Sequence, residues 1–166
     1  EALQQRLEIA GDVESGSKGD GEKRKYDFYY DAANRLLRGD FSQYAGGSFN
    51  QSAGVNYNMK MGDGQDANSA YDYNGNIRRM QQWGLKITGS VQIDDLAYTY
   101  QVNSNKLAKV SESAAGGTLP SGGGGLGDFK DGTNTGTDDY SYDVNGNLVL
   151  DNNTAISNIT YNHLNL

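Results

Sequence analysis

Short runs in which apolar and polar residues alternate are the main structural signal along the chain. Residues 83–93 alternate in this way and residues 96–100 read Leu-Ala-Tyr-Thr-Tyr, so both predict β-strands. Residues 23–30 and 35–41 predict the two strands of a first hairpin. Residues 1–10 are ambiguous, because their leucines have helical spacing while the second half alternates, so a short helix and a strand both stay open. The pattern predicts an all-β chain of short strands.

A motif that begins with an aromatic residue recurs along the chain. The clear copies are YYDAANRLL, AYDYNGNIRRM and SYDVNGNLVLD, at residues 29–37, 70–80 and 141–151. Weaker copies occupy residues 98–110 and 160–166. The anchor tyrosines are Tyr30, Tyr71, Tyr100, Tyr142 and Tyr161. Two of the intervals between them are about twice as long as a third, so each could hold a hidden copy, and residues 53–61 are a candidate.

The spacing within each copy is typical of a β-hairpin. The tyrosine ends one strand, and the Leu or Ile six residues later begins the next. The sequence Asn-Gly-Asn between them, at residues 74–76 and 145–147, supplies the positive φ angles that a tight turn requires. Asp72 and Asp143 open these turns, where a carboxylate can accept hydrogen bonds from backbone N–H groups two residues later.

This pattern resembles the YD repeats of the Rhs (rearrangement hotspot) and teneurin-like family, whose consensus is roughly Tyr-Asp-x-x-Gly-Arg/Asn-Leu. The repeat-defining residues are Tyr30, Asp31, Tyr71, Asp72, Gly75, Tyr100, Tyr142, Asp143, Gly146 and Tyr161. The resemblance implies successive antiparallel hairpins that join into a ribbon or a partial β-shell. In full-length members the ribbon spirals into a hollow shell, often around a C-terminal toxin. Known shells are much longer, and no self-cleavage signature or toxin-like tail is visible, so we expect a fragment or a short member.

Composition divides the chain into four parts. Residues 1–22 form an N-terminal segment and linker, and residues 23–113 hold the first repeat hairpins. Residues 114–139 are rich in Gly and polar residues and predict a mobile loop. Residues 140–166 hold further hairpins.

The bulk composition narrows the choice of partner. Leu, Ile, Val and Phe make up 30 of 166 residues, so we expect the 12 tyrosines to supply apolar area instead. A net charge of −7 argues against nucleic acid as a partner. The absence of cysteine excludes disulfides and thiolate sites. No apolar run is long enough for a membrane-spanning helix.

Candidate metal and nucleotide sites have simpler explanations. Residues 72–76 and 143–147 resemble the start of a calcium loop, but the Gly and Glu that such a loop needs are out of place, and a hairpin turn explains the same residues. Residues 11–18 depart from the phosphate-binding loop at its Lys-Ser/Thr end. Residues 124–128 fall one position short of a β-roll calcium repeat. We expect no cofactor and no metal.

Candidate catalytic residues and adhesion motifs are equally weak. The single histidine, His163, lies in a repeat turn, and no nucleophile-elbow motif accompanies it. The carboxylate pairs at residues 94–95 and 138–139 would face opposite ways in a strand, and a loop fits them better. The Arg-Gly-Asp sequence at residues 38–40 lies where a return strand is predicted to end. We expect no catalytic residue.

The sequence therefore predicts a non-enzymatic β-structural protein that acts in a larger assembly, because the outer strands of a row of hairpins can pair with other chains. Its partner would be a protein, either the rest of a β-shell or a secretion or surface complex. The Rhs resemblance implies an exported or cell-surface location. Two alternatives are an adhesion module that binds glycans through Tyr and Trp83, and an export substrate held by secretion machinery.

Overall fold

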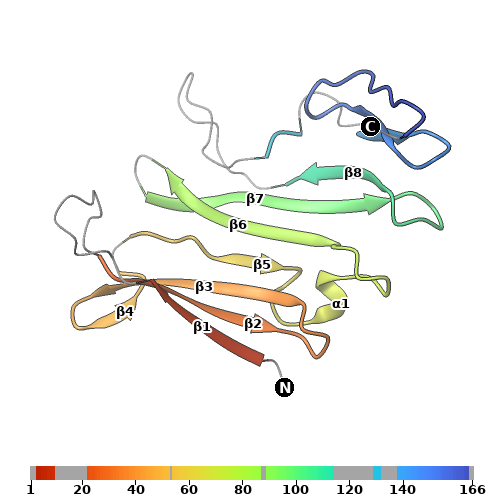
Figure 1. Cartoon of the computed structure of the whole chain (residues 1–166). Coiled ribbons are helices and arrows are strands. Elements are labelled where there is room, and N and C mark those ends of the chain that lie inside the picture. Colours follow the sequence, from red (N-terminus) through yellow and green to blue (C-terminus); the bar gives the residue numbers. More distant parts are fainter. Residues whose placement is uncertain are drawn as a thin grey trace.

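The computed structural model describes residues 3–9, 22–52, 54–86, 89–113, 129–131 and 138–164, and for residues 3–9 it describes the backbone. Its main feature is an eight-stranded antiparallel sheet with the order β1-β2-β3-β5-β6-β7-β8, in which β4 pairs with β3 (Figure 1). The strands are β1 (Leu3–Ile9), β2 (Arg24–Tyr30), β3 (Leu36–Ala45), β4 (Ser48–Asn50), β5 (Met59–Met61), β6 (Arg79–Lys86), β7 (Gly89–Tyr100) and β8 (Leu107–Glu112). A two-stranded sheet follows, formed by β9 (Tyr140–Tyr142) and β10 (Leu148–Asp151).

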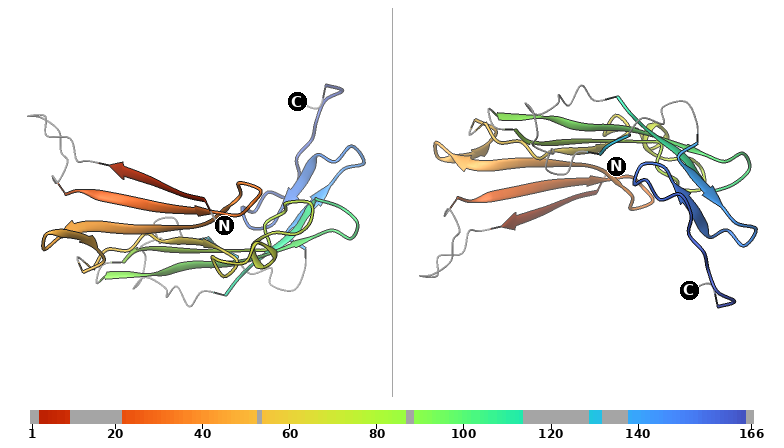
Figure 2. Two further views of the ribbon diagram at one scale, coloured as in Figure 1. Left: turned by 90° about the horizontal axis from the view of Figure 1, so that it is seen from below. Right: turned by 90° about the horizontal axis from the view of Figure 1, so that it is seen from above.

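The sheet is curved rather than flat. In Figure 2, β1 and the β9–β10 hairpin both lie toward the same side of β6 and β7. The pairing register shifts beside two anchor tyrosines, between Tyr29 and Tyr30 in the β2–β3 pair and between Thr99 and Tyr100 in the β7–β8 pair. Because a β-bulge bends a strand and increases its twist, a bulge near the turn of each of these hairpins contributes to the curvature.

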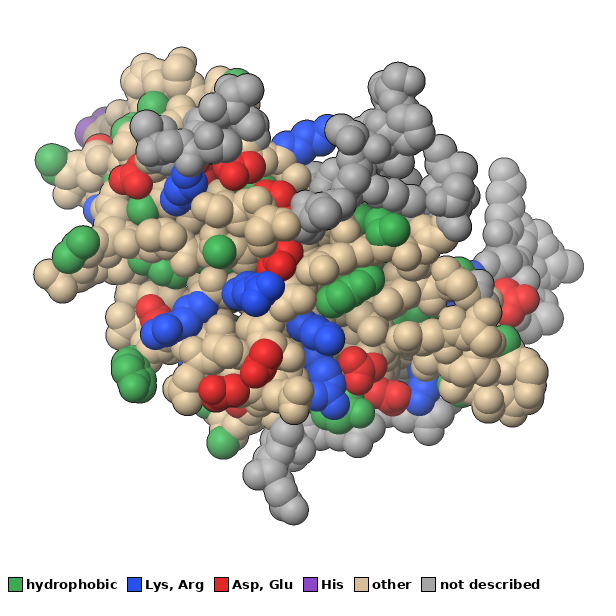
Figure 3. All heavy atoms as spheres, turned by 180° about the vertical axis from the view of Figure 1, so that it is seen from behind, with side chains coloured by type: hydrophobic (Ala, Val, Ile, Leu, Met, Phe, Trp, Pro, Cys, Tyr) green, Lys and Arg blue, Asp and Glu red, His purple; other side chains and the backbone are tan. Residues whose placement is uncertain are grey.

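The two faces of the sheet differ in chemistry. Met61, Met80 and Leu96 are cross-strand neighbours on one face, in β5, β6 and β7. Lys60, Gln81 and Asp95 are the corresponding neighbours on the other. In these two rows, alternation of side chains along each strand places apolar side chains on one face and polar or charged ones on the other. Figure 3 shows Lys and Arg side chains in the middle of the molecule with Asp and Glu side chains next to them.

A buried apolar cluster lies where the single helix of the described part of the chain, α1 (Ala67–Ala70), covers the sheet. Its buried members are Leu37, Met61, Ala70 and Tyr71. Gly62 allows the close approach, since its φ is 57° and an added Cβ would lie 2.5 Å from the backbone nitrogen of Ala70. With four residues, α1 is far too short to cross a bilayer, and no described helix could do so.

The all-β prediction is confirmed, and the helical alternative for the N-terminus is wrong. Residues 3–9 form strand β1, which pairs in register with β2, because the added strand gains a full ladder of backbone hydrogen bonds from its neighbour. The boundary predicted between residues 93 and 96 is also wrong. Strand β6 ends at Lys86 and β7 begins at Gly89, whose φ of 142° is accessible to glycine. Within the predicted mobile loop, residues 114–128 and 132–137 lie outside the described residues, as do residues 11–18.

Candidate functional site: hairpin joints and sheet edges

Three turns contain the same hydrogen-bonded cage around an aspartate, namely Asp31, Asp72 or Asp143. In each, Oδ1 accepts hydrogen bonds of 2.8–2.9 Å from the backbone N–H groups two and four residues later. Oδ2 accepts a hydrogen bond of 2.7–2.9 Å from the side chain four residues later, which is Arg35, Asn76 or Asn147. The aspartate thus satisfies backbone donors that no strand pairs. The role predicted for Asp72 and Asp143 matches this geometry, and the second pair of hydrogen bonds adds to it.

The positive φ that the turn requires lies at the same position in each copy. Gly75 and Gly146 have φ values of 87° and 90°, and Asn34 takes this place in the first copy with a φ of 64°. The backbone N–H of each of these residues donates a hydrogen bond of 3.0 Å to the carbonyl oxygen of the turn aspartate. Asn and Gly tolerate this conformation better than other residues, which explains their recurrence in the sequence.

The cage stabilises the ionised aspartates. Hydrogen bonds from the Asn76 side chain and from backbone N–H groups lower the pKa of Asp72, and those from Asn147 lower the pKa of Asp143 in the same way. Burial alone would raise the pKa of Asp31, but hydrogen bonds from Arg35 and Ala33 outweigh it and lower that pKa below its ordinary value. The turns are therefore held most firmly while these carboxylates are charged.

Each anchor tyrosine after the first is joined to the preceding repeat through its hydroxyl. Tyr71 Oη donates to the carbonyl oxygen of Leu36 at 2.6 Å, and Tyr100 Oη donates to that of Ile77 at 2.9 Å. Tyr142 and Tyr161 donate likewise to the carbonyls of Leu107 and Leu148, at 3.0 and 2.9 Å. Every acceptor is the first apolar residue after the turn of the preceding copy. We call this contact the hairpin joint.

The joints connect consecutive anchors directly. Tyr71 donates its hydrogen bond to the copy anchored by Tyr30, and Tyr142 donates to the copy anchored by Tyr100. These are the two pairs of anchors separated by the longest intervals in the sequence. A hidden copy at residues 53–61 is therefore not needed to continue the series. Tyr57 within it makes a different contact, because its carbonyl oxygen accepts a hydrogen bond from Tyr26 Oη at 3.2 Å.

Cations that the sequence reasoning missed lie on two of the joint tyrosines. The guanidinium carbon of Arg35 is 4.6 Å from the centre of the Tyr71 ring, and Lys106 Nζ is 5.4 Å from that of Tyr142. Both basic residues immediately precede the joint acceptor in sequence. A basic residue at this position of the motif is the sequence signal that could have predicted these contacts. Burial raises the pKa of Tyr71 and Tyr142, so their hydroxyls remain protonated donors at neutral pH.

Two members of the series depart from the pattern. In the third copy Gln101 replaces the aspartate, and the turn is one residue longer, with the Gln101 N–H donating to the carbonyl of Lys106. In the last copy Asn162 Oδ1 accepts from the backbone N–H of Leu164 at 2.8 Å, as the aspartates do from the residue two positions later. His163 lies between these residues in an exposed turn.

Aspartates occupy the outer edge of β8. The N–H of Asp139 donates to the carbonyl of Ala108 at 2.8 Å, and its carboxylate accepts from the N–H of Val110 at 2.7 Å. Asp131 accepts from the N–H of Glu112 at 3.5 Å. Asp139 is completely buried. These contacts take up backbone groups that would otherwise be available to another strand.

The remaining sequence candidates have structural roles. Asp94 and Asp95 lie within β7 rather than in a loop, because both pair with β6, opposite Gln82 and Gln81. Their carboxylates are satisfied there, since Asp94 accepts from the N–H of Phe129 and Asp95 forms an ion pair of 2.6 Å with Arg79. Asp138 and Asp139 lie outside the strands, as predicted. The Arg-Gly-Asp sequence lies inside β3 rather than at its end, since β3 continues to Ala45.

The joints are the repeated feature of the described chain, and within it no group of three or more His, Cys, Asp or Glu side chains is arranged to hold a metal ion. Comparisons with models of protein families, with curated proteins and with solved structures found no match for this chain.

Proposed function

We propose that the chain is a non-enzymatic β-structural protein of the YD-repeat type, exported or surface-associated, that acts through protein–protein contacts in a larger assembly. The observation that carries this proposal is the hairpin joint, which recurs with the same donor and acceptor positions from Tyr71 to Tyr161. A catalytic site places dissimilar groups around one centre, whereas this chain repeats one structural contact along its length.

A series of such joints can be extended. Each repeat offers a tyrosine hydroxyl to the repeat before it and a backbone carbonyl to the repeat after it. Because each contact takes one group from each of two neighbouring copies, the same geometry can continue from one hairpin to the next.

The two edges of the main sheet differ in their suitability for pairing. Aspartates take up hydrogen-bonding groups along β8, whereas β1 pairs with one described strand, β2. A strand with an unpaired edge is a template for another strand. The contact surface proposed here is therefore the outer edge of β1, and the partner would be a protein that adds a strand to it.

Size-exclusion chromatography with light scattering at several protein concentrations tests the proposal. We expect concentration-dependent association of the isolated chain and weakly cooperative melting. The variants Gln4→Pro and Gln5→Pro form a matched pair, because neighbouring residues of a strand direct their N–H groups to opposite sides. The proline that replaces an N–H directed toward β2 should weaken the β1–β2 pair. The proline that replaces an N–H directed away from β2 should reduce association with little loss of stability. A compact monomer that melts cooperatively at every concentration would contradict the proposal.

The glycan-binding alternative has less support. Trp83 is half-buried, and Lys60 Nζ lies 5.3 Å from the centre of its ring. Arg38 lies over Tyr29 on the neighbouring strands, with its guanidinium carbon 3.7 Å from the ring centre. Rings already covered by cations have less face to offer a sugar. A change of Trp83 fluorescence on addition of oligosaccharides would favour this alternative.

A further inference from the structure

Three asparagines stand in the sequence Asn-x-Ser/Thr, the acceptor sequence (sequon) for N-linked glycans. Each has Ser or Thr two positions later, and the middle residue is never proline. The sequons begin at Asn50, Asn152 and Asn158. Nothing in the sequence ranks them. The structure separates them, because the three side chains differ in exposure, in local conformation and in hydrogen bonding.

Glycan transfer uses the asparagine amide as a nucleophile. The C1–O bond between the sugar and the diphosphate of its donor breaks, and a bond between C1 and Nδ2 forms. The diphosphate leaves with the electron pair, and one amide proton passes to a base of the transferase. Because the lone pair of an amide nitrogen is delocalised into the carbonyl group, the amide has to twist out of its plane to react. Hydrogen bonds from Nδ2 to the rest of the protein resist that twist.

The backbone around Asn158 is held in place beside β10. It continues without a turn or bend after the bridge that pairs Ile156 with Asp151. The N–H of Ile159, the next residue, donates to the carbonyl oxygen of Val149 at 2.9 Å. Main-chain contacts therefore fix the position of this sequon, and the asparagine side chain is not needed for that purpose.

Exposure alternates along this segment. Asn158 and Thr160 are exposed, whereas Ile159 and Tyr161 are half-buried. Residues two positions apart in an extended chain lie on the same side, so the amide of Asn158 and the hydroxyl of Thr160 both face outward. Neither side chain forms a hydrogen bond with another described residue. A transferase can therefore reach both groups of the sequon from one direction.

Hydrogen bonds hold the amide of Asn50. Its Nδ2 donates to the carbonyl oxygens of Ala45 and Ser48, at 2.8 and 3.2 Å. Its Oδ1 accepts from the backbone N–H of Ser52 at 2.8 Å. Asn50 is half-buried at the end of β4, where that strand pairs with β3. To react, its amide would have to give up contacts that close the β3–β4 hairpin.

Asn152 is exposed but lies in a turn. Its Nδ2 donates to the carbonyl oxygen of Asp138 at 3.1 Å, and its backbone N–H donates to that of Asp139 at 2.9 Å. Residues 152–155 form the turn. The same-side relationship between positions two apart holds for extended chain, so it does not apply to Asn152 and Thr154. Folding therefore disfavours transfer to this sequon as well.

We propose that Asn158 is the asparagine that accepts an N-linked sugar in the folded chain, with Thr160 as the hydroxyl residue of its sequon. The donor is a nucleotide sugar, whose diphosphate is the leaving group. The inference rests on the proposed function in one respect, since N-linked glycans are typical of exported proteins. In Figure 1 the last repeat and β1 lie at opposite ends of the molecule, so a sugar on Asn158 leaves the β1 edge open.

Incubation of the folded full chain with a soluble N-glycosyltransferase and UDP-glucose, followed by peptide mapping with mass spectrometry, tests the proposal. The unfolded references are synthetic peptides that each carry one sequon and span residues 46–56, 148–156 and 155–163. The rate at each asparagine of the folded chain is divided by the rate of the matching peptide. We expect this ratio to be about tenfold or more higher for Asn158 than for Asn50 or Asn152, because hydrogen bonds have to break at the other two.

Three results would overturn the proposal. The first is a ratio at Asn50 or Asn152 equal to or above that at Asn158. The second is a folded chain that stays unmodified at Asn158 while its peptide reacts. The third is a sequon at Asn158 that reacts neither in the chain nor in the peptide.

Matched variants separate loss of the sequon from loss of the fold. Thr160→Val and Thr154→Val each replace an exposed hydroxyl by a methyl group. Thr160→Val should abolish glucosylation of Asn158, and Thr154→Val should leave it unchanged, with the same circular dichroism spectrum for both. Continued glucosylation of Asn158 in Thr160→Val would overturn the proposal. Light scattering of the chain before and after glucosylation reports association separately, so either proposal can fail alone.

Discussion

Tyr71 Oη donates a hydrogen bond of 2.6 Å to the carbonyl oxygen of Leu36, which lies 35 residues earlier in the chain. Tyr142 and Leu107 form the same pair across the same separation, at 3.0 Å. These two contacts lie where strand pairing is sparse, since β3 and β5 share two residue pairs and β8 and β9 belong to separate sheets. They therefore tie each hairpin to the one before it at junctions that the strand ladder holds least.

Removal of one joint hydroxyl should destabilise the chain. Tyr71→Phe leaves the Leu36 carbonyl without this donor at a site where Tyr71 is 8% exposed, so we expect a loss of about 1–2 kcal/mol. Urea unfolding followed by circular dichroism measures it. Tyr73→Phe is the control, because Tyr73 is 98% exposed and should change stability very little. Equal effects of the two substitutions would remove the joint as a stabilising contact.

The turn cages should make stability depend on pH in the acid range. The folded state lowers the pKa of Asp31 and Asp72, so it binds fewer protons than the unfolded chain as their carboxyls titrate. The contribution of these carboxylates to the free energy of unfolding is fully present above the pKa of the unfolded chain, about 3.9. It is lost as the pH falls through the lower pKa of the folded state. Melting temperatures measured from pH 7 to pH 2 should drop less in Asp31→Asn than in the native chain. Asp138→Asn, at an exposed position, should follow the native profile.

Substitution of two glycines should separate backbone strain from lack of space. Gly75 and Gly62 both have positive φ, of 87° and 57°, but an added Cβ at Gly75 has nothing within 4 Å. We expect Gly75→Ala to cost about 1 kcal/mol and Gly75→Asn less, because Asn34 holds the equivalent position in the first copy. Gly62→Ala should cost about 3 kcal/mol or more, since its Cβ would collide with the α1 backbone. Chemical denaturation provides the comparison, and a larger loss at Gly75 than at Gly62 would contradict it.

Loss of Asp139 should uncover the edge of β8. Asp139→Ala leaves the buried N–H of Val110 without its carboxylate partner, at an expected cost of about 1–3 kcal/mol. The freed edge should also pair with other chains, so light scattering should report larger species than the native chain forms. Asp138→Ala is the matched control one residue away. Unchanged scattering in Asp139→Ala would show that the carboxylate is not needed to protect this edge.

The turns could be predicted from the sequence because everything they need is local. An aspartate, a Gly or Asn that tolerates positive φ, and a side-chain donor all lie within five consecutive residues, at Asp72 and again at Asp143. The weaker third copy differs for an equally local reason. Gln101 stands in place of the aspartate and lacks its short carboxylate, and the turn is one residue longer.

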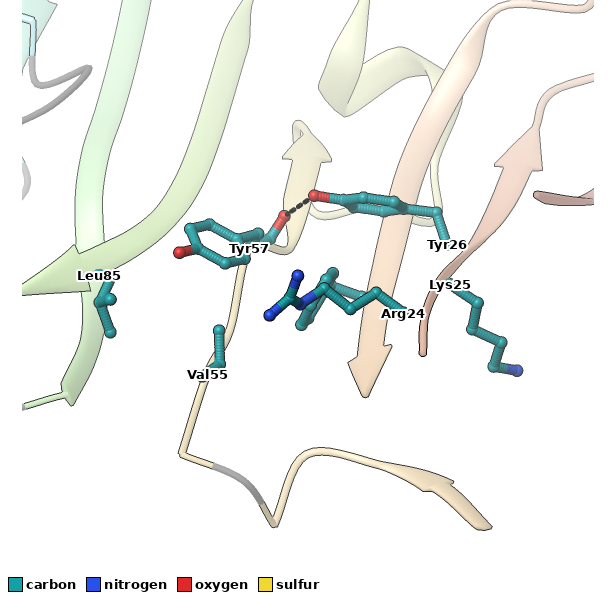
Figure 4. Close-up of a pocket in the computed structure, with 7 residues that line it drawn as sticks. Arg24, Lys25, Tyr26, Val55, Tyr57 and Leu85 are labelled. Atoms are coloured by element: carbon teal, nitrogen blue, oxygen red, sulfur yellow. Dashed lines mark hydrogen bonds between the residues drawn. The ribbon is translucent and has the colours of Figure 1, made fainter. Parts of the chain in front are cut away.

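Other predictions failed because they depend on neighbours distant in sequence. Residues 3–9 have leucines at helical spacing, yet pairing with β2 makes them a strand. Asp94 and Asp95 lie in β7 because they pair with β6, and Phe129 and Arg79 satisfy their carboxylates there. The groove lined by Val55, Tyr57 and Leu85 (Figure 4) likewise arises because β5 has only three residues, and no local sequence pattern predicts that length.

By itself, the sequence determined the all-β class, the anchor tyrosines and the chemistry of each turn, since these follow from alternation and from short-range hydrogen bonding. Only the tertiary structure decided which carbonyl each tyrosine reaches, which sheet edge the aspartates occupy and where β3 and β6 separate to form a groove. Such contacts join residues such as Tyr142 and Leu107 that are far apart along the chain. Their partners are selected by strand pairing and curvature, which belong to the folded sheet as a whole.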